Sequence, residues 1–83
     1  MEVLPISAKV TSKLIKHSLQ KKFNKQLGLL KSNPRHPGLK IELLEPKQYG
    51  IYSFRVDRKY RALFVFRSDK QVLEILAITV HYK

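Results

Sequence analysis

Tyr52-Ser53-Phe54-Arg55-Val56-Asp57-Arg58-Lys59-Tyr60-Arg61-Ala62-Leu63-Phe64 is the stretch that decides the fold of this chain. Aromatic and aliphatic residues crowd both sides of the polar triplet 57–59, which is the pattern of two strands joined by a short turn. A third apolar run, residues 72–80, follows a second polar triplet, Ser68-Asp69-Lys70. Together the three runs predict an antiparallel meander with a hairpin turn at each triplet.

Two shorter segments extend this prediction toward the N-terminus. Residues 39–44 show a period of two, which predicts a strand that ends before Glu45-Pro46. The apolar positions of that period are Leu39, Ile41 and Leu43. Residues 2–6 alternate more weakly, and Pro5 would confine a strand there to an edge of the sheet. The sheet is therefore expected to have three or four strands.

Residues 7–31 have helical spacing. Their apolar residues recur every three or four positions: Val10, Leu14, Ile15, Leu19, Phe23, Leu27 and Leu30. A single helix of this length would span about 37 Å, which a domain of 83 residues has little use for. We therefore expect two helices broken near residues 17–19. A loop with two prolines and a glycine, residues 32–38, ends the helical part.

Two helices followed by hairpin-linked strands predict one α+β domain, with both helices on one face of a mainly antiparallel sheet. The opposite face would then be open. Residues 60–66 and 72–80 are apolar at nearly every position, so the open face should be partly hydrophobic. Such a face calls for something to cover it.

The charge is strongly unbalanced, with 17 Lys and Arg against 6 Asp and Glu, a formal net charge of +11. A charge of this size favours a polyanionic partner, most often nucleic acid. A merely solvated basic surface and an acidic protein partner are the alternatives. Cysteine is absent, and the chain has no long apolar run and no signal-peptide start, so we expect a soluble cytoplasmic protein.

Few residues are suited to chemistry. The three histidines, at 17, 36 and 81, have no metal-ligand spacing, and the glycines are scattered singly, so neither a metal nor a cofactor is expected. Arg55 and Arg61 lie within apolar strands, where a planar cation is costly unless it is paired or binds an anion. The alternative for both is an ion pair with Asp57 or Glu74. Whether they share a sheet face depends on the hairpin register.

Three of the remaining residue types match what RNA cleavage requires. A carboxylate such as Glu42 can accept the proton of a 2′-hydroxyl, an arginine can stabilise charge on phosphorus, and a histidine such as His81 can protonate the departing oxygen. Taken singly, Glu42 is equally an exposed strand residue beside a lysine. His81 and Tyr82 are equally an exposed residue and a packing residue.

The chain resembles the RelE/ParE toxin superfamily over residues 17–82. Residues 29–40 are similar to its helix-to-strand passage, residues 52–64 to its central hairpin, and His81-Tyr82 to the terminal pair of the YoeB-like branch. Counted back from Arg61 without gaps, Glu42 falls on that branch's general base. The resemblance makes Arg61 the phosphate-stabilising arginine, His81 the general acid, Tyr82 its neighbour and Arg55 a basic substrate contact.

The resemblance also implies a toxin of a toxin–antitoxin module, which cuts messenger RNA on the ribosome and leaves a 2′,3′-cyclic phosphate and a 5′-hydroxyl. Further RNA contacts are expected from the basic residues Lys13, Lys21, Lys25, Lys40, Arg58 and Lys59. A cognate antitoxin is expected on the open face, in a heterocomplex or beside a homodimer. A ParE-like gyrase poison remains an alternative, against which the His81-Tyr82 pair argues. A noncatalytic RNA-binding module or an inactive toxin relic is another.

Overall fold

The computed structural model describes residues 1–67 and 71–80. Its helices are α1 (Ala8–Lys16) and α2 (Gln20–Ser32), and its strands are β1 (Glu2–Val3), β2 (Glu42–Leu43), β3 (Tyr52–Arg55), β4 (Tyr60–Arg67) and β5 (Val72–Val80). Two short 3-10 turns, η1 (Pro37–Leu39) and η2 (Lys47–Tyr49), flank β2. Neither helix in this part of the chain is long and apolar enough to cross a membrane.

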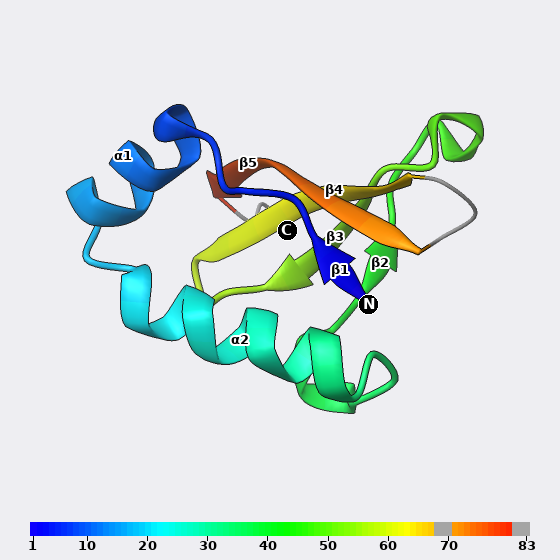
Figure 1. Ribbon diagram of the computed structural model, residues 1–83, viewed down its shortest axis with the longest axis horizontal. Coiled ribbons are helices and arrows are strands. Elements are labelled where there is room, and N and C mark those ends of the chain that lie inside the picture. Colours follow the sequence, from blue (N-terminus) through cyan, green and yellow to red (C-terminus); the bar gives the residue numbers. More distant parts are fainter. Residues whose placement is uncertain (68–70, 81–83) are drawn as a thin grey trace.

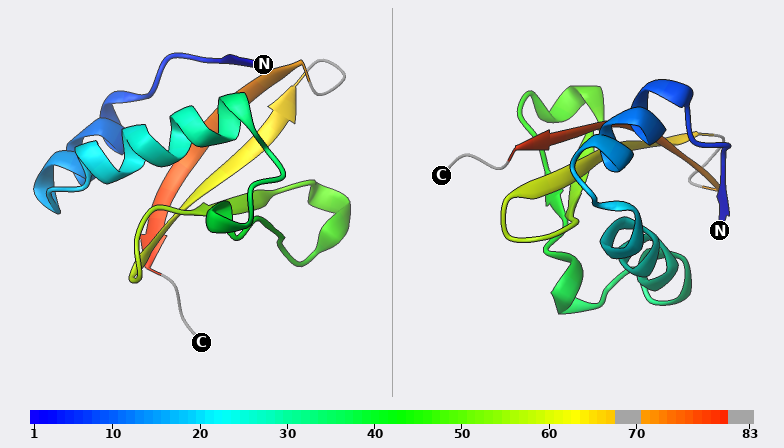
Figure 2. Two further views of the ribbon diagram at one scale, coloured as in Figure 1. Left: turned by 90° about the horizontal axis from the view of Figure 1, so that it is seen from below. Right: turned by 90° about the vertical axis from the view of Figure 1, so that its left-hand side faces the viewer.

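The strands of the described part form one sheet in the order β1-β5-β4-β3-β2. β1 runs parallel to β5, and the other neighbours are antiparallel. The predicted α+β fold, with helices on one side of a mainly antiparallel sheet, is confirmed (Figures 1 and 2). The sheet has five strands where three or four were expected, because both two-residue edge segments pair.

The helical segment divides where it was expected to. The Ser7 side chain caps α1 by accepting a hydrogen bond from the Val10 amide at 3.2 Å. Ser18 follows the end of α1 with a left-handed backbone, φ 55°, which ends the helix and turns the chain into α2. The prediction of two helices is confirmed.

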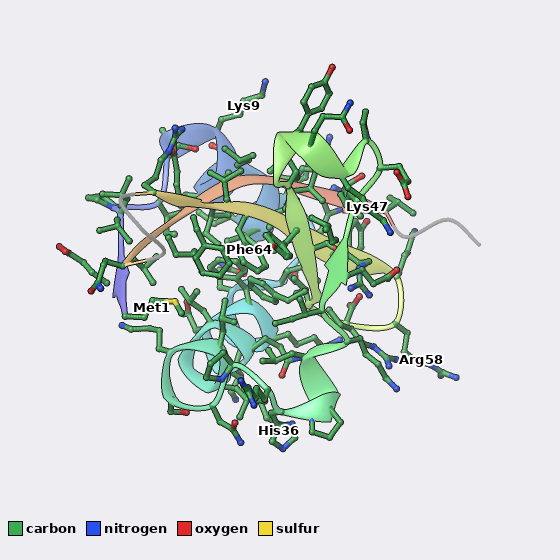
Figure 3. The ribbon with its side chains drawn as sticks, turned by 90° about the vertical axis from the view of Figure 1, so that its right-hand side faces the viewer. Met1, Lys9, His36, Lys47, Arg58 and Phe64 are labelled. Carbon is green, nitrogen blue, oxygen red and sulfur yellow. The ribbon has the colours of Figure 1, made fainter. Side chains whose placement is uncertain are left out.

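The core lies between α2 and the helix-facing side of the sheet. Phe23 of α2 packs on Phe54 of β3, with ring centroids 6.0 Å apart, and Phe54 packs on Phe64 of β4 at 5.8 Å. All three side chains are essentially inaccessible to solvent. Phe64 lies at the centre of the molecule between sheet and helix (Figure 3). Since side chains alternate along a strand, the residues between these core positions point to the opposite face.

The strand predicted over residues 39–44 is wrong in its extent. Leu39 lies in η1 and is buried in the core, while only Glu42–Leu43 pair with β3. The backbone of Lys40 is left-handed, φ 49°, which is incompatible with a continuous strand. Pro37 also favours the turn, since its fixed φ suits the first position of a helical turn.

The predicted turn at residues 57–59 is confirmed. Asp57 Oδ1 accepts hydrogen bonds from the amides of Lys59 and Tyr60, both at 2.8 Å, which closes the turn between β3 and β4. The register sets Arg55 directly opposite Arg61, so the two arginines share one face of the sheet. The second predicted turn, Ser68-Asp69-Lys70, lies outside the described residues.

Candidate active site

Arg61 lies at the start of β4 on the face of the sheet opposite the helices, which we term the open face. Its strand neighbours Tyr60 and Ala62 are buried on the helix side, so Arg61 and Leu63 point the other way. Arg61 is nevertheless only 7% exposed, which is uncommon for an arginine. Its surroundings therefore have to satisfy its charge and its hydrogen-bond donors.

Three segments of the chain hold the Arg61 guanidinium. Nε donates to Ser53 Oγ on β3 at 2.9 Å, and Nη2 donates to the Ser53 carbonyl at 3.4 Å and to the Lys40 carbonyl. Nη2 also lies 3.3 Å from Glu42 Oε1 on β2. Within the described residues Nη1 has no partner, so one edge of the fork is left for an anion.

The electrostatic environment of Arg61 contains opposing contributions. Burial lowers the pKa of Arg61, the charge of Glu42 raises it in part, and the like charge of Arg55 lowers it further. A guanidinium nevertheless stays cationic at neutral pH. Two arginines face each other across the hairpin with one carboxylate beside them, and a second negative charge would relieve their repulsion.

This group opens into a hollow of about 270 Å³ on the open face, here termed the Arg61 hollow. Its lining consists of Glu42, Leu44, Ser53, Arg61, Leu63, Thr79 and Val80. The Glu42 side chain is about half exposed while that of Arg61 is almost covered, so the carboxylate is accessible and the cation is fixed. The arrangement suits a solvent-facing base beside a preorganised cation.

The structure brings together two of the four residues expected to be catalytic. Glu42 and Arg61 form an ion pair in the Arg61 hollow. The other two, His81 and Tyr82, lie outside the described residues. The end of β5 borders the hollow through Thr79 and Val80, directly before them in sequence.

The basic residues expected to bind RNA are more dispersed. Arg58 and Lys59 are exposed in the β3–β4 turn, and Arg58 points away from the body of the protein (Figure 3). Lys40 contributes its carbonyl to Arg61 while its side chain is exposed. Lys13 lies on α1 beside β5, where it lines a small hollow of about 140 Å³ with residues 76–78.

The two α2 lysines among the expected RNA contacts differ in position. Lys25 lines a hollow together with Arg55, at the end of β3. Lys21 is exposed on α2 and lines neither that hollow nor the Arg61 hollow. Of these two lysines, it is Lys25 that lies next to a residue of the hairpin.

The alternative ion pairs considered for the arginines are wrong. Asp57 pairs with Lys22, with Oδ2 and Nζ 3.5 Å apart, and Glu74 pairs with Arg67 at 2.7 Å. Arg55 Nε instead donates to the Asp57 carbonyl at 3.3 Å. The side-chain carboxylates of the hairpin and of β5 thus leave both arginines on the open face available to an anion.

Ser53 is a site residue that sequence reasoning did not identify. It is 1% exposed and supplies both its hydroxyl and its carbonyl to Arg61. A serine between Tyr52 and Phe54 in an apolar strand was the available signal, because a buried hydroxyl needs a partner. The described residues contain no group of three or more His, Cys, Asp or Glu placed to hold a metal ion.

Comparison with known proteins identifies the fold of this chain. No family model matches the chain, and no curated protein matches it. Among solved structures, a YoeB/ParE toxin from Agrobacterium tumefaciens is 20% identical, with a TM-score of 0.74 over 99% of this chain and 100% of that one. The chain has the fold of the RelE/ParE toxins.

Two further structures support this RelE/ParE-like fold. YafQ from E. coli is 18% identical, with a TM-score of 0.71 over 96% of this chain and 90% of that one. YoeB in a heterotetrameric toxin–antitoxin complex with YefM from Staphylococcus aureus is 19% identical, with a TM-score of 0.70 over 99% of this chain and 98% of that one. The resemblance drawn from the hairpin is confirmed at the level of the RelE/ParE-like fold.

Proposed function

We propose that this chain is the toxin of a toxin–antitoxin module and that it cleaves messenger RNA on the ribosome. The observation that carries the proposal is the ion pair of Glu42 and Arg61, 3.3 Å apart in a hollow on the open face of a RelE/ParE-like fold. A base and a fixed cation beside one another are what transfer of a phosphodiester to a neighbouring hydroxyl needs. Catalysis on translated RNA would place the protein in the cytoplasm.

In the proposed reaction the ribose 2′-oxygen attacks the adjacent phosphorus and the bond from phosphorus to the 5′-oxygen breaks. The Glu42 carboxylate takes the proton of the 2′-hydroxyl, and His81 gives a proton to the departing 5′-oxygen. The products are a 2′,3′-cyclic phosphate and a 5′-hydroxyl, so atoms and charge balance without metal or cofactor. Each proton transfer of this kind contributes roughly 10²- to 10⁴-fold in rate.

Arg61 would stabilise the charge that builds up on the phosphoryl oxygens. The Ser53 hydroxyl and the Ser53 and Lys40 carbonyls hold it in place independently of Glu42. The half-exposed carboxylate can therefore turn from Arg61 to the substrate without releasing the cation. A donor fixed before the reaction costs no reorganisation in the transition state, and such donors are worth about 2.7 to 4 kcal/mol.

The role of His81 rests on sequence and covalent geometry. His81 follows Thr79 by two residues, and Thr79 lines the Arg61 hollow. Because consecutive Cα atoms are only about 3.8 Å apart, the chain can deliver an imidazole to this hollow. A histidine is the natural acid near neutral pH. Tyr82 would act beside it as a substrate contact.

The partner follows from charge and from the relatives of this fold. Staphylococcus aureus YoeB has been solved both with its antitoxin YefM and as a dimer. We propose that an acidic antitoxin covers the open face of this chain and neutralises Arg55 and Arg61, since the net charge is +11. Heterocomplex formation and self-association are both compatible with that surface.

The test is induced expression followed by primer extension on translated messages. Wild-type protein should produce cuts within codons on the ribosome, with 5′-hydroxyl ends downstream, and His81→Gln should abolish them while still binding RNA. Intact messages together with DNA damage would instead identify a gyrase poison. Harmless expression with RNA binding retained would leave a noncatalytic module.

A further inference from the structure

A second hollow, of about 240 Å³, lies where α2 meets the end of β3. It is lined by Lys22, Lys25, Gln26, Gly38, Arg55 and Val56, and we term it the Lys25 hollow. Arg55 is the last residue of β3 and comes from a segment about 30 positions from the two lysines. The fold thus gathers three cationic residues from two elements around one cavity.

Few negative charges lie near the Lys25 hollow. Among the described residues that line the Lys25 hollow there is no carboxylate. Asp57 lies next to it, 3.5 Å from Lys22, but its other oxygen is taken by the turn amides. One negative charge against three positive ones leaves an excess of two. Concentrating cations in this way disfavours the folded chain unless an anion binds.

Gln26 lines this hollow and connects the elements around it. Its Nε2 donates to the Arg55 carbonyl at 2.7 Å and to the Gly38 carbonyl at 3.2 Å, which joins α2 to β3 and to η1. Both carbonyl oxygens would otherwise repel an anion, and the amide occupies them. Gly38 adds no side chain, and a Cβ there would lie 3.0 Å from the His36 ring. With both carbonyls bonded and three cationic residues in the lining, the polarity of this hollow favours an anion.

Arg55 links the two hollows. It lines the Lys25 hollow and is also the register partner of Arg61 across the hairpin. Partner Cα atoms in an antiparallel pair are only about 4.5 to 5.5 Å apart. An anion held by Lys22, Lys25 and Arg55 would therefore be a close neighbour of one held by Arg61. A nucleic-acid strand carries its anionic groups in a row, so one strand could present a phosphate to each hollow.

We propose that the Lys25 hollow binds a phosphodiester of the same RNA strand, next to the linkage held at Arg61. The strand then passes over the end of the hairpin toward α2. Arg55 offers a planar fork to the phosphate oxygens, and Lys22 and Lys25 act as point charges. This inference deepens the proposed function and rests on its RNA substrate.

The first experiment measures binding of a 2′-O-methyl RNA, which cannot be cleaved, to the full chain by fluorescence anisotropy across a salt series. A single strand of about twelve nucleotides is long enough to pass both hollows. Lys25→Ala should weaken binding severalfold and reduce the slope of log K against log salt by about 0.7, the value for one phosphate contact on a single strand. Lys47→Ala is the matched control, since Lys47 is exposed on η2 and lines neither hollow. Equal effects of the two variants would overturn the proposal.

The second experiment locates the contact by amide NMR. RNA should shift the Gly38 and Val56 amides and the Gln26 side-chain amide, and these shifts should shrink in Lys25→Ala. A 2′-O-methyl dinucleotide is too short for both positions, so the loss of affinity in Lys25→Ala relative to the Lys47→Ala control should be smaller than with the longer strand. Shifts that miss Gly38 and Gln26 would overturn the site. Saturation by inorganic phosphate that RNA cannot displace would make it a site for free phosphate and overturn the RNA assignment.

The two proposals fail separately. If Glu42→Gln and His81→Gln leave cleavage unchanged while Lys25→Ala still alters RNA binding, the cleavage mechanism is wrong and the phosphate site stands. If cleavage behaves as proposed but Lys25→Ala and Lys47→Ala are indistinguishable, the second site is wrong.

Discussion

Arg61 on β4 reaches across Ser53 of the intervening strand β3 to Glu42 on β2, with Nη2 and Oε1 3.3 Å apart. The ion pair therefore spans three strands, and the middle one supplies two acceptors to the cation. The carboxylate is at the exposed end of this row and the guanidinium at the buried end. Under the proposed function, the effects on cleavage and on stability should therefore separate: Glu42 would act in the reaction alone, and Arg61 would act both in the reaction and in the stability of the fold.

Glu42→Gln should abolish most of the cleavage and barely affect folding. The amide cannot accept the 2′-hydroxyl proton, so the cleavage rate should fall by about 10²- to 10⁴-fold. Ion pairs with a solvent-exposed partner contribute only about 0 to 1 kcal/mol to the free energy of unfolding. Cleavage of a ribosome-bound message and thermal unfolding of the same preparation check both halves. A rate within twofold of wild type would remove Glu42 from the reaction.

Ser53→Ala should mainly destabilise the protein. The substitution leaves the buried Arg61 Nε without its acceptor, which costs about 1 to 3 kcal/mol of the free energy of unfolding. Cleavage should fall less than in Glu42→Gln, because the Lys40 and Ser53 carbonyls still hold Nη2. Urea unfolding measures the first effect and single-turnover cleavage the second. An unchanged unfolding midpoint would show that Nε finds another acceptor.

Asp57 should stabilise the hairpin turn in a pH-dependent way. Burial raises the pKa of Asp57, but the Tyr60 and Lys59 amides and the charge of Lys22 outweigh it, so this pKa lies below its ordinary value. A carboxyl whose pKa is lowered by folding contributes stability above its ordinary pKa, and the contribution disappears as the pH falls through the lowered value. Asp57→Asn keeps an acceptor for the two amides and loses only the charge.

The measurement compares wild type with Asp57→Asn in thermal unfolding at about pH 7 and at about pH 3. Wild type should be the more stable at the higher pH, and the difference should narrow in acid. Asp57→Ala, which also loses both amide bonds, should cost about 1 to 2 kcal/mol at neutral pH. A difference between wild type and Asp57→Asn that grows in acid would contradict the assigned direction of the pKa.

Tyr60→Phe offers a stability control away from the proposed reaction. The Tyr60 hydroxyl lies 3.1 Å from His17 Nδ1 at the end of α1, and the two rings pack with centroids 5.0 Å apart. Losing this hydrogen bond should cost about 0.5 to 1.5 kcal/mol of the free energy of unfolding. Cleavage should be unchanged at temperatures where the variant is folded, because Tyr60 faces the helices. A variant that is stable but inactive would tie this pair to the site.

The hairpin was predictable because its signals are local. Aromatic and aliphatic residues on both sides of Asp57-Arg58-Lys59 specify two strands and a turn whatever the rest of the chain does. The strand over residues 39–44 failed for the complementary reason. Its apolar residues do alternate, but Leu39 lies in η1 and is buried in the core, and Lys40 adopts a left-handed backbone. The tertiary contact of Leu39 therefore determined the local structure in place of the alternation.

The residues of the candidate site also divide into those that the sequence indicated and those that only the structure revealed. Glu42 and Arg61 were chosen by residue type and by resemblance, and the structure brings them together. Gln26 and Lys22 carried no signal of their own in the sequence, and Ser53 carried only that of a hydroxyl within an apolar strand. Their importance comes from partners 8, 12, 29 or 35 residues away, such as Arg61 for Ser53 and Arg55 for Gln26.

The sequence alone determined the fold class, the break between the two helices, the central hairpin and the strongly cationic character of this protein. Periodicity and turn chemistry depend on neighbouring residues, and net charge is a simple sum over the chain. Only the tertiary structure decided that Arg55 and Arg61 share a face, that Arg61 is buried against Ser53 and Lys40, and that α2 brings Lys25 to the end of β3. Strand register and the packing of a helix on a sheet depend on contacts between segments that are distant in sequence. The free energy of burying these segments against each other cannot be read from the sequence of any one segment.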